Sequence, residues 1–270
     1  MKFAEDDWHR RKQTVELPGS GRMAFVDTGG SGPALLMLHG FSDTSRSFAM
    51  LEPLLSGYRL LIPDMPGHGG SALGEGMRIS DFATSMVSLL RQLDVSPVAI
   101  LGHSMGAMTA IDIASRGDLT AIMLLSASLK PDFASESSIS RAIRSLRDPI
   151  DPSGAFLREW YACAMPVDPD FLMKMKVDAA AMPAAVWHGI LKGFACTDLT
   201  LNAAQITAPV LCVGGSSDPL FGLSHRRELS RAFRSVRSIT LEGHGHNPHW
   251  EDPQAVAKHL LSFLSEIRGT

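Results

Sequence analysis

Cysteine is scarce in this sequence, and long apolar segments are absent. Three cysteines (Cys163, Cys196 and Cys212) occur among 270 residues, and no two of them form a CxxC pair. An odd, scattered set of cysteines argues against a disulfide framework and against a zinc site built on cysteines. No apolar run approaches the ~20 residues that cross a bilayer. Residues 1–11 carry both signs of charge and lack the apolar segment of a secretory signal. We therefore expect a cytoplasmic protein with no membrane partner.

Positive charge is also limited. The 25 lysines and arginines are outnumbered by 28 aspartates and glutamates, which gives a net charge of -3. Nucleic-acid binding needs a concentrated basic surface, so we expect no nucleic-acid partner. No Walker loop or GxGxxG motif follows an apolar run, and the clustered histidines near the C-terminus lack carboxylate or cysteine partners at ligand spacing. We therefore expect neither a cofactor nor a metal ion.

Apolar content is sufficient for one large core, because hydrophobic residues make up 45% of the chain. Short runs rich in Leu, Ile and Val are separated by Gly, Pro and Asp, which is typical of strands buried on both faces of a parallel sheet. The predicted parallel strands are Ala34–Leu38, Tyr58–Ile62, Val98–Leu101, Ala121–Ser126, Val210–Val213 and Arg237–Leu241. Residues 21–26 predict an earlier, antiparallel edge strand.

Helical periodicity occurs between these runs. Residues 80–93, 106–115 and 253–267 place apolar side chains at steps of three and four, and Ser80 is a candidate N-cap. Strands that alternate with helices indicate an α/β fold. Residues 130–208 differ, because they contain only helical fragments interrupted by prolines. We expect this segment to be a helical insertion over the carboxyl edge of the sheet, where α/β folds bind ligands.

The strongest chemical motif is Gly102-His103-Ser104-Met105-Gly106. It lies between a predicted strand and a predicted helix, which is the setting of a nucleophile elbow. The glycines allow a sharp turn that presents Ser104 above the sheet, at a helix N-terminus that favours negative charge. The motif therefore predicts that Ser104 is a nucleophile.

A serine hydroxyl needs a base, and the base needs an orienting group. In proteins with such an elbow the order along the chain is serine, acid, histidine. Asp218 follows the strand at 210–213 and is the candidate acid. The segment after the last predicted strand supplies three candidate bases, His244, His246 and His249.

At this point the chain resembles the α/β-hydrolase family. Gly245-His246 with Pro248, Glu251 and Pro253 is similar to the family ending G-H-x-P-x-x-E-x-P, and this register selects His246 with His244 as the alternative. The segment from Asp64 to Ser71 resembles the family's D-x-P-G-x-G-x-S turn, which implies a structural rather than a catalytic role for His68. His39-Gly40-Phe41 resembles the H-G-x turn, which implies that the backbone N–H groups of Phe41 and Met105 form the oxyanion hole and that His39 supports this turn.

The resemblance covers the whole chain except the insertion. It implies an α/β fold with a mostly parallel, eight-stranded sheet flanked by helices, and a helical cap after the sixth strand. We place the core at residues 1–129 and 209–270 and the cap at residues 130–208. A serine at the elbow, rather than aspartate or cysteine, argues against epoxide hydrolases, haloalkane dehalogenases and dienelactone-hydrolase relatives.

Aromatic and methionine side chains in the insertion favour a mainly apolar pocket for a small or medium carboxylic ester or lactone. The candidate substrate contacts are His39, His103, Trp160 and Trp187. Three alternatives remain open: a hydrolase of carbon–carbon bonds in aromatic ring-cleavage products, an acyltransferase or perhydrolase, and a ligand-sensing receptor. The oligomeric state is not indicated by the sequence.

Overall fold

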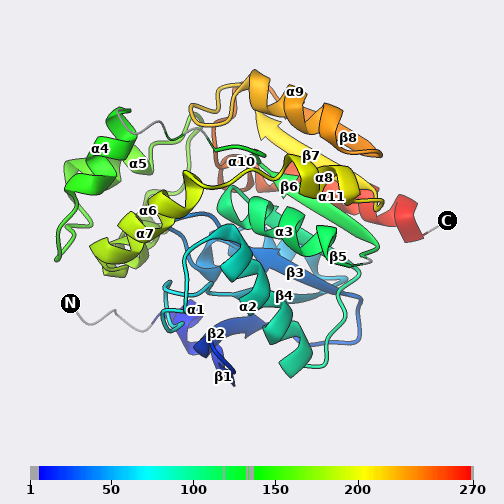
Figure 1. The fold of residues 1–270 in the computed structure, drawn as a ribbon, viewed down its shortest axis with the longest axis horizontal. Coiled ribbons are helices and arrows are strands. Elements are labelled where there is room, and N and C mark those ends of the chain that lie inside the picture. The colour runs from blue at the N-terminus through cyan, green and yellow to red at the C-terminus, as the bar shows by residue number, and fades with distance from the viewer. Residues whose placement is uncertain (1–5, 118, 132, 134–136, 269–270) are drawn as a thin grey trace.

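The computed structural model describes residues 6–117, 119–131, 133 and 137–268, and its centre is an eight-stranded sheet (Figure 1). The strand order is β1-β2-β4-β3-β5-β6-β7-β8, and all neighbours from β4 to β8 pair in parallel. The strands are β1 (Gln13–Leu17), β2 (Gly21–Asp27), β3 (Ala34–Leu38), β4 (Arg59–Pro63), β5 (Ala99–His103), β6 (Ala121–Leu125), β7 (Val210–Gly215) and β8 (Val236–Leu241). The predicted sheet is thereby confirmed.

The prediction of an edge strand at residues 21–26 is wrong in one respect. β2 is antiparallel to β4, as expected, but β1 pairs with its other side and forms the edge. β1 was not predicted because its residues are mostly exposed or half-buried, so its sequence lacks a continuous apolar run.

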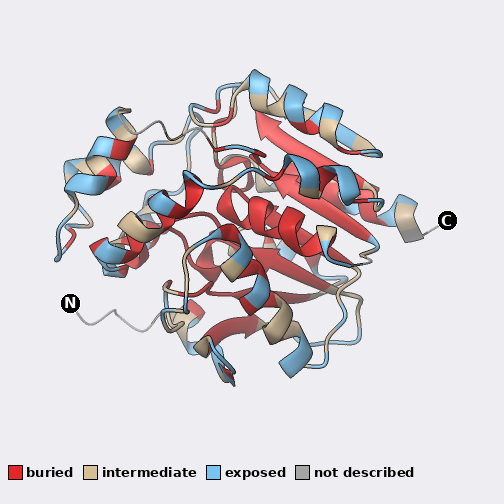
Figure 2. Cartoon of the chain, in the orientation of Figure 1, coloured by how far each residue is buried: buried red, intermediate tan, exposed pale blue. Residues whose placement is uncertain are grey.

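Side chains of the strands alternate between two apolar layers, as the pleat of a β-strand requires. Leu36 and Leu38 of β3 point to one layer, and Leu35 and Met37 point to the other. The first layer is covered by α2 (Ile79–Gln92), α3 (Met105–Ser115), α8 (Thr200–Gln205) and α9 (Leu223–Ala232). The second is covered by α1 (Asp7–Arg10), the 3₁₀ turns η1 (Ser45–Phe48) and η2 (Glu52–Leu55), and α11 (Pro253–Arg268). The inner strands β3 to β7 are consequently buried almost throughout, whereas the outer strands β1 and β8 are partly exposed (Figure 2).

The start of α2 differs from the sequence expectation. Its N-cap is Arg78 rather than Ser80, and the Arg78 backbone N–H donates to the Asp81 carboxylate at 2.9 Å. Asp81 therefore satisfies a free N–H group from inside the first turn, which moves the helix start two residues upstream.

The described residues between β6 and β7 form five helices, and the first four lie together on one side of the molecule (Figure 1): α4 (Ser138–Ser145), α5 (Ala155–Trp160), α6 (Pro169–Ala181) and α7 (Ala184–Phe194). We call α4 to α7 the cap helices. Within the described part of residues 130–208 there is no strand, in line with the predicted helical insertion. The fifth helix of the segment, α8, packs on α3, where the Asn202 side-chain amide donates to the Ser115 hydroxyl at 2.9 Å.

The domain limits at residues 129/130 and 208/209 stay a prediction. The predicted ranges also include residues 1–5, 118, 132, 134–136, 269 and 270, which lie outside the described residues.

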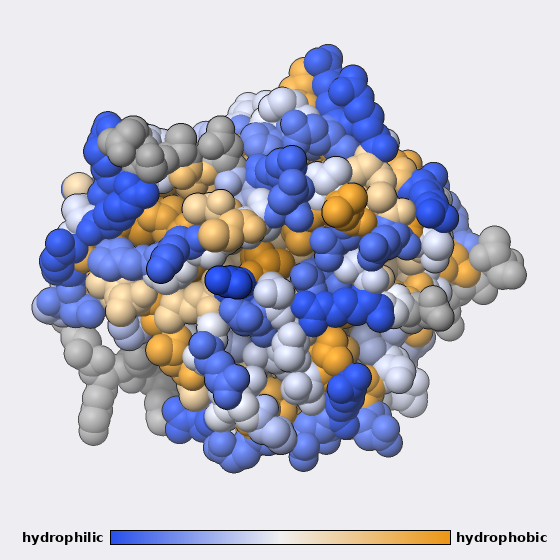
Figure 3. All heavy atoms as spheres, in the orientation of Figure 1, coloured by the Kyte–Doolittle hydropathy of each residue, from blue (hydrophilic) through white to orange (hydrophobic). Residues whose placement is uncertain are grey.

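A buried ion pair joins the cap helices to the core. The Arg46 Nε of η1 donates to the Asp178 carboxylate of α6 at 2.8 Å, and both side chains are almost fully buried. Hydrophobic and hydrophilic residues are interspersed over the cap helices, as Figure 3 shows at the left of the view. Among the described residues, no helix is both long enough and apolar enough to traverse a bilayer.

Candidate active site

Ser104 lies at the junction between β5 and α3 in a backbone conformation that few non-glycine residues adopt. Its φ is 52° and its ψ is -113°. Two glycines permit the turn: a Cβ on Gly102 would lie 2.3 Å from the Gly106 carbonyl oxygen, and one on Gly106 would lie 2.1 Å from the Leu38 carbonyl oxygen. Side chains at these positions would push α3 away from the sheet. The predicted strand–turn–helix setting of Ser104 is therefore present.

The three predicted triad side chains meet at the carboxyl edge of the sheet. The Ser104 Oγ lies 3.0 Å from the His246 Nε2, and the His246 Nδ1 lies 2.9 and 3.0 Å from the two Asp218 carboxylate oxygens. With the proton on Nδ1 donated to Asp218, Nε2 is free to accept the proton of the serine. Both hydrogen bonds have the length expected of a nucleophile, a base and an orienting group.

The surroundings of the Asp218 carboxylate favour its ionised form. Burial alone would raise its pKa, but the charge and hydrogen bond of His246 and the backbone N–H groups of Leu220 and Phe221 hold the pKa of this carboxyl well below its usual value. These N–H groups donate to the Asp218 Oδ1 at 2.8 and 3.0 Å. An ionised carboxylate at this distance favours a positive charge on the imidazole of His246.

The loop that carries His246 is held by Glu251. One carboxylate oxygen of Glu251 accepts the Gly245 N–H at 2.6 Å, and the other accepts the Ala164 N–H at 3.1 Å. The alternative base, His244, points elsewhere, because its Nδ1 contacts the Glu242 carbonyl and its Nε2 faces Asp252. His249 is fully buried and contacts the Ser47 hydroxyl through Nε2.

The loop after β3 brings the Phe41 backbone to the same edge. No hydrogen bond engages the backbone N–H of Phe41 or of Met105 within the part of the chain that the structure describes. Two buried imidazoles brace this loop: His39 contacts the Gly40 carbonyl through Nδ1 and accepts the Met65 N–H through Nε2, while the His68 Nε2 lies 2.6 Å from the Phe41 carbonyl oxygen.

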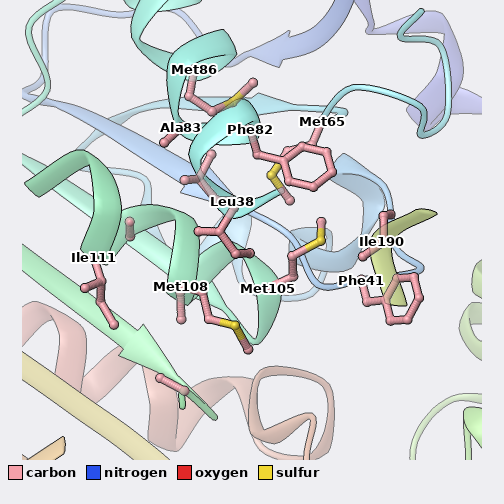
Figure 4. Close-up of a cluster of buried hydrophobic side chains, with 14 of the residues drawn as sticks. Leu38, Phe41, Met65, Phe82, Ala83, Met86, Met105, Met108, Ile111 and Ile190 are labelled. Carbon is pink, nitrogen blue, oxygen red and sulfur yellow. The ribbon is translucent and has the colours of Figure 1, made fainter. Parts of the chain in front are cut away.

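An apolar cluster packs around the side chains of Phe41 and Met105, the residues of the two proposed oxyanion donors. The side chains of Phe41 and Met105 pack with those of Leu38, Met65 and Met108, and Ile190 of α7 closes the cluster beside Phe41 (Figure 4). These side chains are almost completely buried. The backbone of both segments is therefore immobilised by packing as well as by hydrogen bonds.

A cavity of about 330 Å³ opens onto Ser104 between the sheet edge and the cap helices. Of the four predicted substrate contacts, His103 and Trp160 line this cavity, whereas His39 and Trp187 do not. Trp187 is fully buried behind Phe41, with ring centroids 5.1 Å apart. The cavity therefore gives no support to a substrate contact at His39 or Trp187. The remaining lining is mostly apolar and includes Phe133, Ile139, Ala142, Phe156, Phe194, Leu220 and Trp250.

The carboxylate of Asp43, which was not among the residues predicted from the sequence, lines the same cavity. The hydroxyl of Tyr161 donates to the Asp43 Oδ1 at 3.1 Å, and the Ser47 hydroxyl donates to the Asp43 Oδ2 at 3.2 Å. Trp160 donates from its indole N–H to the Ser42 Oγ at 2.7 Å. Only the position of Asp43 beside the His39-Gly40-Phe41 turn could have pointed to it, because its partner Tyr161 comes from a segment more than a hundred residues away.

Within the described residues, no group of three or more His, Cys, Asp or Glu side chains is arranged to hold a metal ion.

The sequence is similar to those of several known proteins. The Magnesium-chelatase 30 kDa subunit of Rhodobacter capsulatus is 40% identical over 93 residues, which is 33% of either chain, so the match spans a third of that relative's length. The (E)-2-((N-methylformamido)methylene)succinate hydrolase of Acinetobacter baylyi is 22% identical over 258 residues, covering 93% of this chain and 97% of that protein.

The solved esterase EaEST from Exiguobacterium antarcticum superposes with a TM-score of 0.83 at 18% identity, covering 94% of this chain and 99% of the esterase. At this identity the likeness concerns the fold alone. The sequence itself matches the model of the Alpha/beta hydrolase family over residues 35–259. A match over so much of the chain, together with the parallel sheet and the serine turn, makes this protein a member of the alpha/beta hydrolase family.

Proposed function

We propose that this protein is a serine hydrolase that cleaves small or medium carboxylic esters or lactones through an acyl-enzyme on Ser104. The observation that carries the proposal is the contact of the Ser104 Oγ with the His246 Nε2 at 3.0 Å, at the floor of a cavity. A serine hydroxyl in this relation to an imidazole that a carboxylate orients is an activated nucleophile.

The first half of the reaction transfers the acyl group to the enzyme. The Ser104 oxygen attacks the ester carbonyl carbon while His246 takes the hydroxyl proton at Nε2. The carbonyl oxygen becomes an oxyanion, which accepts hydrogen bonds from the backbone N–H groups of Phe41 and Met105. The carbon–oxygen bond to the alcohol then breaks, and His246 returns the proton to the leaving alkoxide.

The second half regenerates the serine. Water loses a proton to the His246 Nε2 and attacks the acyl carbon, which again forms an oxyanion between the same two N–H groups. Collapse of this intermediate breaks the bond to the Ser104 oxygen, which recovers its proton from His246, and the carboxylic acid leaves. Asp218 accepts the Nδ1–H hydrogen bond throughout and remains ionised.

The substrate class follows from the cavity. A space of about 330 Å³ with mostly apolar and aromatic walls suits a short or medium acyl chain better than a polymer. The name of the Exiguobacterium antarcticum relative is esterase, which is compatible with this class.

A fluorophosphonate probe tests the proposal, because it reacts only with an activated serine. We expect mass spectrometry to locate the adduct on Ser104, Ser104→Ala to lose it, and His246→Ala to weaken it strongly. The matched control is Ser42→Ala, which removes another cavity serine that does not contact His246 and should leave labelling of Ser104 intact. A panel of p-nitrophenyl esters and lactones then reports turnover. Absence of both labelling and turnover in the wild type would contradict the proposal.

A further inference from the structure

A carboxylate is built into the wall of the cavity beside the nucleophile. The Asp43 side chain is 5% exposed and lines the same cavity as Ser104. Its hydrogen bonds come from the hydroxyls of Tyr161 and Ser47, which are uncharged donors. These donors stabilise the ionised form, but they do not cancel its charge.

The basic side chains around Asp43 do not cancel this charge either. Burial lowers the pKa of His39 to about 3 and lowers the pKa of His249 well below its usual value. Burial also lowers the pKa of His103 and outweighs the opposite pull of Asp43, which lies 3.7 Å from its Nδ1. Burial therefore disfavours a full positive charge on any of the three imidazoles, so Asp43 has no permanent cation beside it in the cavity wall.

The pKa of Asp43 agrees with an ionised group. Burial raises it, but the contacts with His103, His39 and Tyr161 hold it below the usual value. A second carboxylate, that of Glu159, lies at the rim of the cavity, where its side chain is exposed. The described residues that line the cavity include no lysine or arginine.

We propose that Asp43 makes this cavity select esters with an uncharged acyl group and reject esters whose acyl group ends in a carboxylate. The inference rests on the proposed ester hydrolysis at Ser104 and adds the charge of the substrate. A neutral chain can lie against Ile139, Ala142, Phe156 and Phe194, which are apolar. A carboxylate in the same place would lose its hydration and meet the charge of Asp43 without a compensating cation.

The size of the effect follows from Coulomb's law. Two like charges several ångströms apart, at the effective dielectric constant of a protein site, repel each other by about 2 kcal/mol. A repulsion of this size lowers kcat/KM by roughly 30-fold. Dehydration of the substrate carboxylate acts in the same direction.

Two esters of equal length measure the selection directly. p-Nitrophenyl methyl adipate is neutral, whereas p-nitrophenyl hydrogen adipate carries a carboxylate at the same end, and both release the same chromophore. After correction for spontaneous hydrolysis, we expect the wild type to prefer the neutral ester by roughly 30-fold in kcat/KM. Equal kcat/KM values for the two esters would overturn this inference alone. Hydrolysis of neither ester would contradict the proposed function as well.

Substitution of Asp43 isolates its charge. Asp43→Asn keeps an oxygen for the Tyr161 hydroxyl and removes the charge, so the preference for the neutral ester should fall to a few-fold. The matched control is Ser138→Ala, which removes a polar group of the same cavity on α4 and should keep the wild-type preference. An equal loss of activity on both esters in Asp43→Asn would mean a purely structural role and would overturn the inference.

A second variant tests the same idea without touching the buried network. Ala142 lies on α4 and lines the cavity, so Ala142→Arg adds a cation to the cavity that Asp43 also lines, and Ala142→Gln adds a polar side chain without charge. We expect Ala142→Arg to raise kcat/KM for the anionic ester relative to Ala142→Gln by tenfold or more. No difference between these two variants would contradict control of the cavity by charge.

Discussion

The His68 Nε2 lies 2.6 Å from the Phe41 carbonyl oxygen, so the turn after β4 holds the loop that carries one of the proposed oxyanion donors. A carbonyl oxygen can only accept a hydrogen bond, and the imidazole is therefore the donor. The contact joins two segments that are 27 residues apart in sequence. It gives His68 a positioning role at a site that it does not touch.

Replacement of His68 should therefore weaken the proposed oxyanion hole. We expect His68→Leu to lower kcat by about tenfold to a hundredfold with little change in KM, since full removal of an oxyanion donor costs 10²–10³-fold. Steady-state kinetics on a neutral p-nitrophenyl ester give both constants, and a melting curve reports folding. His244→Gln is the control, because the His244 side chain is directed to the Glu242 carbonyl and Asp252. A loss of activity in His244→Gln instead would favour the alternative base.

Asp218 should contribute to the rate far more than to folding. In Asp218→Asn the amide can present an N–H to the His246 Nδ1, which favours the wrong tautomer of the imidazole. We expect kcat to fall by about 10⁴-fold, as is typical for the orienting acid of such a triad. Asp252→Asn, near the unrelated His244, is the control and should keep its rate. A loss smaller than tenfold in Asp218→Asn would argue against the assigned acid.

The close approach of α3 to the sheet depends on Gly106. A Cβ at this position would lie 2.1 Å from the Leu38 carbonyl oxygen, so the helix would have to move outward. We expect Gly106→Ala to lose roughly 1–3 kcal/mol of unfolding free energy through overpacking and to lose most of its activity. Gly117→Ala is the matched control, because a Cβ there meets no atom within 4 Å. Urea denaturation compares the two variants, and equal stability would contradict the assigned role of Gly106.

The buried pair of Lys12 and Asp64 should determine part of the stability in acid. The Lys12 Nζ donates to the Asp64 carboxylate at 2.7 Å, and both side chains are buried. Burial raises the pKa of Asp64, but Lys12 and the Gly70 N–H lower it below the ordinary value of 3.8. Because the pKa is lower in the folded state, this contribution to stability is present above about pH 3.8 and is lost as the pH falls towards the folded-state pKa.

Removal of the carboxylate charge should expose this contribution. At neutral pH we expect Asp64→Asn to lower the unfolding free energy by about 3–5 kcal/mol, because Lys12 then stays buried without a counter-charge. The difference from the wild type should shrink as the pH falls below 3.8 in a series of urea titrations. The exposed pair Lys130–Asp198 provides the control, and Lys130→Ala should have no measurable effect. A difference that is independent of pH would contradict the linkage.

Buried strands and the serine turn could be predicted because their signals are local. The apolar run at residues 34–38, bounded by Gly and Pro before it and by Gly after it, is typical of a buried strand. The G-x-S-x-G pattern around Ser104 is likewise visible within five residues, although the atom that requires a glycine at position 106 is the distant Leu38 carbonyl oxygen. The choice of His246 depended on register against Glu251, and Glu251 does hold the preceding Gly245 N–H.

Features that depend on contacts between distant segments could not be predicted in this way. Trp160 and Trp187 belong to the same aromatic-rich insertion, yet one lines the cavity and the other packs behind Phe41. The pairing of Asp43 with Tyr161 joins two different parts of the chain, and a lone aspartate in a turn gives no sign of it. The start of α2 also depends on which of two nearby polar residues, Ser80 or Asp81, accepts a hydrogen bond from the free backbone N–H groups.

The cap helices leave the sheet from β6 and return to it at β7, and these two strands are direct neighbours, with Leu125 opposite Val213. In the topology of the sheet, the whole segment is one long connection between adjacent strands. The length of this connection can therefore change without changing the order of the strands, while contacts such as those of Asp178 with Arg46 and of Ala164 with Glu251 fix its position on the core. A change in this connection can alter the walls of the cavity while the strands that carry Ser104 and Asp218 keep their order in the sheet.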